Sequence, residues 1–271
     1  MEHHVSGITH FVNHYLGQFA LALLSALHIQ PSDPELPIPE HVVMALVVLV
    51  LVTVVALFLR SRLSVERPGA TQQVAEMHLT NALGFGIKDL LDENIHHGAS
   101  KLIPFVGSIS IFVLCSNLLG LVPVFTSPTA QVSVPLACAI LTFLNFNWQG
   151  IKHHGPVGYV KHFAGPVAWL SPLIFPVEII STTARIVSLT VRLWANIFAS
   201  DLLYSIFVGL FTSATLAAWA KSPILGIVVA IFPMTIPIAF IALHLLVSVI
   251  QAYIFTVLPS VYMGMATADE H

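Results

Sequence analysis

Hydrophobic positions gather in five long runs that short polar segments separate. The first three runs, 41–59, 102–125 and 132–151, are each of a length suited to one membrane-crossing helix. The last two runs, 172–218 and 223–265, each exceed 40 residues. As a helix, each would be ~60–70 Å long, whereas the hydrocarbon core of a bilayer is ~30 Å thick.

Each of the last two runs is therefore either two short spans or one steeply tilted helix. Residues 186–200 contain no Gly or Pro, and Pro233 and Pro237 bring no charged turn. The pattern favours two long tilted helices that form a hairpin around 221–223. Because ordinary tilt is ~20°, a steeper helix implies a partner with a curved face.

The polar segments complete the predicted organisation. Residues 1–40 form an extracytoplasmic or interfacial segment, with an amphipathic stretch at 5–27, and 41–271 form a single membrane domain. Segment 72–97 mixes apolar and charged residues, which predicts an amphipathic helix on the cytoplasmic surface. The fold class is thus an all-α polytopic membrane protein with about five crossing helices and one surface helix.

Composition and charge support this class and set its orientation. The chain is 56% hydrophobic and 8% charged, against about 25% charged in soluble domains. Lys and Arg residues follow the first and third runs, which places those ends in the cytoplasm, the N-terminus outside and the C-terminus inside: Arg60, Arg62, Arg67, Lys152 and Lys161. No transit sequence is visible, which favours a bacterial plasma (inner) membrane.

The same features exclude several classes of function. Nothing suggests nucleic-acid binding, a metal site or a cofactor, and no P-loop pattern suggests that the chain binds a nucleotide. Cys115 and Cys138 both lie in apolar runs, so we interpret them as small hydrophobic residues and not as a disulfide.

Arg192 is the most informative residue, because it lies inside a membrane-length apolar run. A cation at this depth costs at least ~2.5–3.5 kcal/mol. Arginine cannot avoid that cost by losing its proton. Such a residue is expected to face a partner charge or an ion path.

Other polar residues follow a helical pattern around Arg192. Glu178 and Arg185 precede it at intervals of seven and share its face of the helix, which Asn196 continues. Asp201 is nine residues beyond Arg192 and points to the opposite side. In the last run, two polar residues seven apart share one face: His244 and Gln251.

This pattern suggests two aqueous half-paths that do not meet, with a fixed cation between them. A mobile carboxylate beside Arg192 is driven to ionise, so it could carry a proton from one path to the other. Individually, the residues also have structural explanations. Arg185 could extend to the lipid headgroups, Asn196 and Gln251 could join helices by hydrogen bonds, His244 could be an ordinary buried histidine, and Asp201 could pair with Lys221.

Two segments resemble the signatures of a known family. Residues 188–201 contain the pattern Ser-Leu-x-x-Arg-Leu-aromatic-small-Asn, with an acidic residue nine after the Arg, and Gln251–Leu258 match a second signature. Both resemble subunit a of bacterial F-type ATP synthases. Glu178, His244, the Lys88-Asp89 pair and Asn117 also match, so the resemblance covers most of the chain from about residue 41.

The resemblance implies a stator subunit that couples proton flow to ATP synthesis or hydrolysis performed on other subunits. The two tilted helices would pack against the rotating ring of c subunits, which supplies the mobile carboxylate. The first span and the surface helix would face the b-type stalk, which leads to the catalytic head. Each polar residue then has a role: Arg192 as the essential cation, Asp201 and His244 on the outside path, Asn196 and Gln251 near the ring, and Glu178 on the cytoplasmic path.

The chain departs from the family pattern at three positions. Gly120 stands where some relatives carry an Asp. This helix therefore has no acidic residue at that position to contribute to the outside path. Ala195 and Ser200 stand where relatives often have Gly. Both side chains are small, so close helix packing is preserved.

Other classes of function remain open at this point. A self-contained proton or ion transporter would show internal repeats with broken helices, and we see none. A purely structural anchor would not need Arg192. Metal binding by the adjacent pairs His96-His97 and His153-His154 is disfavoured, because adjacent residues point to different sides of a helix. Sodium could replace the proton as the transported ion.

Overall fold

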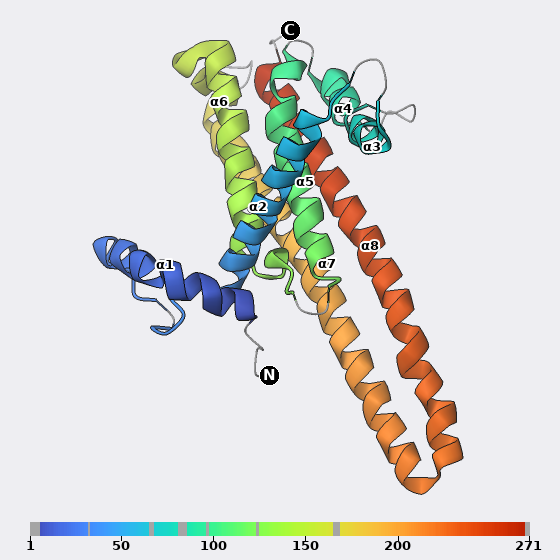
Figure 1. The fold of residues 1–271 in the computed structure, drawn as a ribbon. Helices are drawn as coiled ribbons and strands as arrows, with labels where there is room; N and C mark the ends of the chain where they lie inside the picture. The colour runs from blue at the N-terminus through green and yellow to red at the C-terminus, as the bar shows by residue number, and fades with distance from the viewer. Residues whose placement is uncertain are drawn as a thin grey trace. The chain divides into compact units, whose positions relative to one another are not determined.

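The computed structural model is helical, as the sequence predicts. It describes residues 6–31, 33–64, 68–80, 86–95, 98–122, 125–164 and 169–268. Three residues used in the sequence analysis lie outside these ranges. Arg67 helped to set the predicted orientation, and His96 and His97 belong to the metal-site alternative. The α-helices are α1 (Gly7–Ala26), α2 (Glu40–Ser61), α3 (Ala70–Leu79), α4 (Ile87–Asn94), α5 (Ile103–Leu119), α6 (Ser133–Ala164), α7 (Ser171–Lys221) and α8 (Pro223–Thr267). Short 3₁₀ turns are η1 (Ala99–Lys101) and η2 (Pro128–Ala130) (Figure 1).

Within the described residues, four helices are long and apolar enough to cross a membrane, namely α2, α6, α7 and the 237–267 part of α8. α5 is a shorter apolar helix. These five elements confirm a multi-pass, all-α architecture. α5 ends at Leu119, six residues before the end of its predicted span at 125, and Gly120 follows it. Glycine is about 1 kcal/mol less favourable than alanine inside a helix.

The two long apolar runs are two single helices and not four short spans. α7 has 51 residues and α8 has 45, and only Ser222 separates them. α8 begins with Pro223, a residue whose fixed φ suits the first helical position and whose missing N–H costs nothing there. The predicted hairpin is therefore confirmed, while its tilt in a bilayer stays a prediction.

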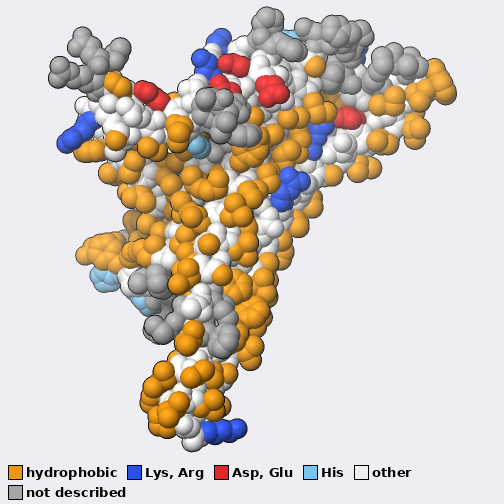
Figure 2. Space-filling view, turned by 90° about the vertical axis from the view of Figure 1, so that its right-hand side faces the viewer, with side chains coloured by type: hydrophobic (Ala, Val, Ile, Leu, Met, Phe, Trp, Pro, Cys, Tyr) orange, Lys and Arg blue, Asp and Glu red, His pale blue; other side chains and the backbone are white. Residues whose placement is uncertain are grey.

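The chain forms two compact units. The first contains residues 1–45, 116–131 and 193–250, and the second contains 46–115, 132–192 and 251–271. In the first unit, the adjoining parts of α7 and α8 run side by side (Figure 1), and the rings of Phe207 and Phe240 lie 5.2 Å apart between centroids. Hydrophobic side chains cover most of this hairpin's visible face (Figure 2), which suits contact with lipid or another apolar helix.

The N-terminal segment belongs to the first unit. Ser6 caps α1 by accepting a hydrogen bond from the Thr9 amide. Asn13 then exchanges two hydrogen bonds with the backbone of Ile38, at 3.0 and 2.9 Å. These bonds tie the loop after α1 back onto the helix.

In the second unit, the segment predicted as one surface helix, 72–97, contains two. α3 ends at Leu79 with an extended Thr80, and α4 begins at Ile87 after an extended Gly86. The prediction of a single helix was wrong, because Gly84 and Gly86 are each about 1 kcal/mol less favourable than alanine in a helix. The intervening 81–85 lie outside the described residues.

α4 uses its apolar face to join the core of the second unit. Ile87 and Leu91 are buried together with residues of α5, α6 and α8. The remaining buried members of this core are Ile95, Ala99, Leu102, Val106, Phe146, Tyr159, Met263 and Ala266. α4 therefore packs on the ends of apolar helices, and its charged residues are left on its outer side.

α6 continues past its predicted end at 151 and then breaks. Gly155 has φ +73°, and Pro156 follows it. Positive φ suits glycine, and proline cannot donate the hydrogen bond that would continue the helix. Beyond the break, Tyr159 donates a 3.0 Å hydrogen bond to Asn147, and Gly150 leaves room for its ring.

Gly264 provides a test of the packing between α8 and α4. A methyl group at this position would overlap the backbone carbonyl oxygen of Asn94. We expect Gly264→Ala to destabilise the protein by about 1–3 kcal/mol, the usual cost of overpacking. Thermal unfolding can be followed by the reaction of buried Cys138 with a thiol-reactive dye.

The matched control is Gly209→Ala, because nothing lies within 4 Å of the methyl group that it adds to α7. This change should leave stability the same or raise it by up to about 1 kcal/mol through helix propensity. Equal unfolding temperatures for the two variants would show that α8 does not pack on α4 at Gly264.

Candidate functional site

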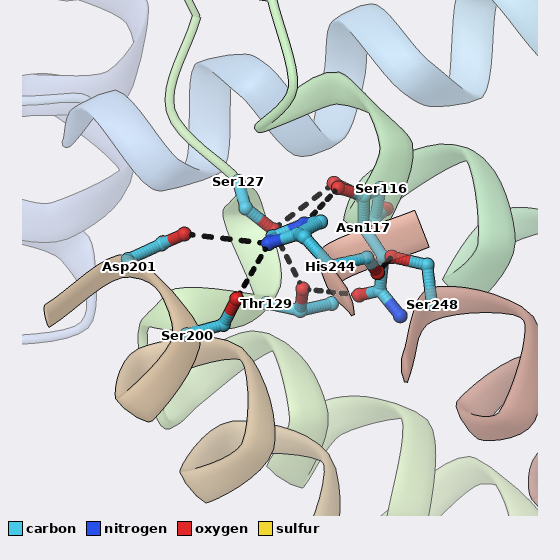
Figure 3. Close-up of polar contacts among 8 residues, drawn as sticks. All are labelled: Ser116, Asn117, Ser127, Thr129, Ser200, Asp201, His244 and Ser248. Atoms are coloured by element: carbon cyan, nitrogen blue, oxygen red, sulfur yellow. Dashed lines mark hydrogen bonds and ion pairs between the residues drawn. The ribbon is translucent and has the colours of Figure 1, made fainter. Parts of the chain in front are cut away.

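A buried histidine in the first unit is the centre of a polar network (Figure 3). His244 of α8 is 5% exposed. Its Nδ1 lies 3.0 Å from Ser200 Oγ and 3.7 Å from Asp201 Oδ1, both on α7. Its Nε2 lies 3.0 Å from the backbone oxygen of Asn117 on α5. The imidazole thus joins α5, α7 and α8.

The partners of His244 decide which ring nitrogen can exchange a proton. The Asn117 carbonyl oxygen only accepts hydrogen bonds, so Nε2 carries a hydrogen in every charge state. In the neutral ring, Nδ1 accepts from the Ser200 hydroxyl. In the charged ring, Nδ1 can donate to Ser200 Oγ at 3.0 Å, and the ring forms an ion pair with Asp201 at 3.7 Å. With these partners, Nδ1 is the ring nitrogen whose hydrogen can differ between charge states, and it faces the partly exposed Asp201 carboxylate.

Asn117 links the histidine to a second set of hydroxyl groups. Its side-chain oxygen accepts a 2.6 Å hydrogen bond from Thr129, whose oxygen lies 2.8 Å from that of Ser127. Ser127 is also placed to donate to the Ser116 carbonyl at 3.0 Å. Since each hydroxyl carries one hydrogen, Ser127 donates either to Ser116 or to Thr129. The network therefore has two hydrogen-bond arrangements.

Two buried polar atoms in this network lack a hydrogen-bond partner among the described residues. They are the side-chain nitrogen of Asn117 and the hydroxyl oxygen of Ser116. An unsatisfied buried polar group costs about 1–3 kcal/mol, and water is its usual partner when the site is roomy and polar. Buried polar atoms without a protein partner are expected where water can reach them.

His244 and Asp201, predicted from the sequence to belong to one functional group, lie together in the structure. Ser200 was predicted only as a small packing residue, and no role was predicted for Ser127 and Thr129, so their place in the network was missed. One available signal was that Ser200 is a polar residue next to Asp201 inside an apolar run. The alternative pairing of Asp201 with Lys221 is not the contact that the structure shows, which is with His244.

Gly120 also belongs to this region. A methyl group there would lie 3.0 Å from the Ser127 Cβ and 3.4 Å from the Asn117 carbonyl oxygen. Both distances are close to or below ordinary contact, so the loop with Ser127 leaves little room for a side chain. This tight packing is consistent with a glycine here in place of the Asp that some relatives carry.

Arg192 is partly buried on α7, and its guanidinium donates a 3.3 Å hydrogen bond to Ser188 Oγ, one turn earlier. Asn196 is exposed on the same helix. Gln251 of α8 is 1% exposed, and its side-chain oxygen has no hydrogen-bond partner in the described part of the chain.

Glu178 and Arg185 of α7 form a second polar group, in the second unit. The nearest side-chain oxygen and nitrogen are 3.7 Å apart, with Arg185 15% and Glu178 40% exposed. The guanidinium also lies over the Tyr262 ring at 4.8 Å and near the Phe146 ring at 5.8 Å. Arg185 therefore packs into the protein beside Glu178 and does not extend away from it, and a cavity of about 50 Å³ adjoins the pair.

Known proteins show a consistent similarity to this chain. A family profile described as ATP synthase A chain matches residues 41–264. The chain is 37% identical over 268 residues to ATP synthase subunit a of Koribacter versatilis (strain Ellin345), which covers 99% of each protein. It is 40% identical over 215 residues to ATP synthase subunit a of Nitratidesulfovibrio vulgaris (strain DP4), which covers 79% of this chain and 80% of that relative. Both polar groups lie within the matched residues.

Proposed function

Since this chain belongs to the ATP synthase subunit a family, which forms part of the proton-translocating membrane sector, we propose that it provides two separate proton half-channels to a rotating ring of c subunits. The buried network around His244 carries this proposal. Inside a largely apolar helical protein, a buried titratable ring faces a partly exposed carboxylate. Such a pair is suited to passing protons.

The path from the outside ends at His244 in this proposal. Asp201 is 42% exposed and can exchange protons with water, and its carboxylate lies 3.7 Å from the Nδ1 atom of His244. Ser200 lies 3.0 Å from the same atom and can accept or donate as the ring changes charge. The unsatisfied amide of Asn117 and hydroxyl of Ser116 support entry of water beside the ring.

Arg192 separates the two paths. Along α7, Arg192 follows Glu178 and precedes Asp201, so the cation stands between the two acidic groups in sequence. A carboxylate of the ring that passes Arg192 is driven to release its proton, because a nearby cation favours the ionised form. The same cation repels a proton that would cross directly. Asn196 and Gln251 are proposed to lie near the passing ring.

Glu178 leads to the cytoplasmic side. Arg185 lies beside its carboxylate, and its guanidinium lies over the Tyr262 and Phe146 rings at 4.8 and 5.8 Å. Glu178 thus has a cation beside it, while 40% of its side chain stays exposed. A partly exposed carboxylate is suited to accept a proton from the ring and to release it to water.

The family implies a complex with other subunits, and the remaining assignments are part of the proposal. The long helices α7 and α8 face the c-subunit ring, and α2 with α3 and α4 faces the b-type stalk, which connects to the catalytic head. Residues 1–40 lie outside a bacterial plasma membrane, residues 41–271 form the membrane domain, and the C-terminus is cytoplasmic. ATP chemistry takes place on other subunits, so this chain is non-catalytic.

Site-directed thiol labelling tests the two half-channels. In the assembled complex, Asp201→Cys and Glu178→Cys are introduced separately after Cys115 and Cys138 have been changed to serine. A membrane-impermeant maleimide reacts with a thiolate, which requires water. We expect labelling of Asp201→Cys from the outside only and of Glu178→Cys from the cytoplasm only.

Leu210→Cys is the matched control on α7, because this apolar side chain is 59% exposed and belongs to neither half-channel in the proposal. It should remain unlabelled from both sides. Labelling of both test positions from one side, or of Leu210→Cys as strongly as Asp201→Cys, would contradict the two half-channels. Labelling of both test positions from one side would favour a self-contained transporter or a structural anchor.

A further inference from the structure

A larger polar hollow lies in the second unit. It shares Met265 with the cavity beside Glu178, but neither Glu178 nor Arg185 lines it. Its volume is about 790 Å³, and it is bounded by the end of α4 with η1, by α6 and by the C-terminal turns of α8. The volume exceeds by far that of the cavity beside Glu178. Nothing in the proposed proton path uses this hollow.

The lining of the hollow combines cations with an apolar wall. Lys101, Lys152 and His153 supply the basic groups. Ile95, Leu102 and Met265 are among the apolar lining residues, and no Asp or Glu is among the lining residues that the structure describes. Neither Lys101 nor Lys152 has a carboxylate partner within the described part of the chain. The hollow therefore suits a ligand with an anionic head and an apolar body.

The depth of the hollow in the membrane follows from its neighbours. Lys101 stands two residues before α5, and Lys152 stands one turn after Trp148 on α6. Trp148 is 63% exposed, and exposed tryptophans of membrane proteins concentrate at the level of the lipid headgroups. Basic pockets between membrane helices at this level are suited to anionic headgroups.

We infer that this hollow binds an anionic phospholipid, with Lys101 and Lys152 on the phosphate and the apolar wall along the first part of an acyl chain. A free phosphate ion would use the two lysines but not Ile95, Leu102 and Met265. A lipid uses both parts of the lining. The bound lipid would fill the space between α6 and the end of α8 and so stabilise their packing.

Photo-crosslinking in the assembled ATP synthase tests the site. The complex is placed in phosphatidylcholine nanodiscs with a photoreactive phosphatidylglycerol, and labelling of this subunit is measured against increasing unlabelled lipid. We expect competition by phosphatidylglycerol but not by extra phosphatidylcholine or by inorganic phosphate. Lys101→Gln with Lys152→Gln should weaken apparent affinity about 30-fold, because each lysine near an anionic lipid contributes about a fivefold factor.

The matched control is Lys88→Gln with Lys161→Gln, which removes the same charge from the second unit outside the hollow. It should change apparent affinity by no more than about twofold, as expected for exposed surface charges. An equal loss in both double variants would overturn the site. Competition by inorganic phosphate would also overturn it, in favour of a soluble anion.

One further variant tests whether the chain's own C-terminus occupies the basic groups. Asp269 and Glu270 follow Ala268, which is itself a lining residue. Asp269→Asn with Glu270→Gln should leave lipid labelling unchanged. If labelling occurred only in this variant, the lysines would be neutralised by the C-terminal carboxylates in the native protein, and the proposal would be wrong.

Discussion

Replacing Arg192 by alanine is expected to abolish ATP-driven proton pumping, with a fall of at least about 100-fold. At a separation of 4 Å and an effective dielectric constant near 20, a cation stabilises a carboxylate by about 4 kcal/mol. That energy corresponds to about a thousandfold change in the ionisation equilibrium. Without Arg192, a carboxylate of the ring would, in the proposed mechanism, lose the charge that drives proton release. Pumping and passive proton leak would be measured in vesicles that contain the assembled complex.

Arg192→Lys should also lose coupled pumping. Lysine is a compact charge that loses its proton readily when it is desolvated, whereas the guanidinium stays charged. Val191→Ala, an exposed neighbour on α7, is the control and should pump normally. If either Arg192 variant pumps in a fully assembled complex, then a simple charge or no charge suffices, and the assigned role of Arg192 is wrong.

Replacing His244 by phenylalanine is expected to reduce proton flux at least tenfold, and by about 100-fold if the ring acts as a proton relay of ordinary efficiency. The change removes the atom that faces Asp201 and Ser200. It also leaves the Asn117 carbonyl oxygen without its donor, which costs about 1–3 kcal/mol. Proton flux and thermal stability of the complex would be measured side by side.

His244→Gln separates the relay from the structural role. A glutamine amide can donate to the Asn117 carbonyl oxygen, but it does not titrate. We therefore expect this variant to recover stability and to keep the low flux. Recovery of flux as well would show that His244 only positions its neighbours.

Ser248→Ala serves as the control for His244. Ser248 is buried in the same network, but its hydroxyl donates 2.7 Å to the His244 carbonyl of its own helix. That bond is local to α8, so its loss should cost less than about 1 kcal/mol and leave proton flux unchanged. A loss of flux equal to that of His244→Phe would mean that any disturbance of the buried network blocks transport.

Several features could be predicted from local sequence alone. Hydrophobic runs predict the membrane-crossing helices, because the insertion of a helix into a bilayer depends on its length and apolar composition and not on the helices that pack beside it. The absence of Gly and Pro in 186–200 predicts that α7 is continuous, as the structure confirms. The cost of placing a cation in an apolar run is enough to identify Arg192 as a candidate functional residue.

Other features depend on tertiary structure. His244 meets a carbonyl oxygen 127 residues away and a hydroxyl 44 residues away, and no periodicity along one helix predicts such contacts. Arg185 could equally have extended to the headgroups, and only the rings of Phe146 and Tyr262 show that it packs inward. Hydropathy and spacing describe one helix at a time, whereas the hydrogen-bond partners of a side chain depend on which helices pack around it.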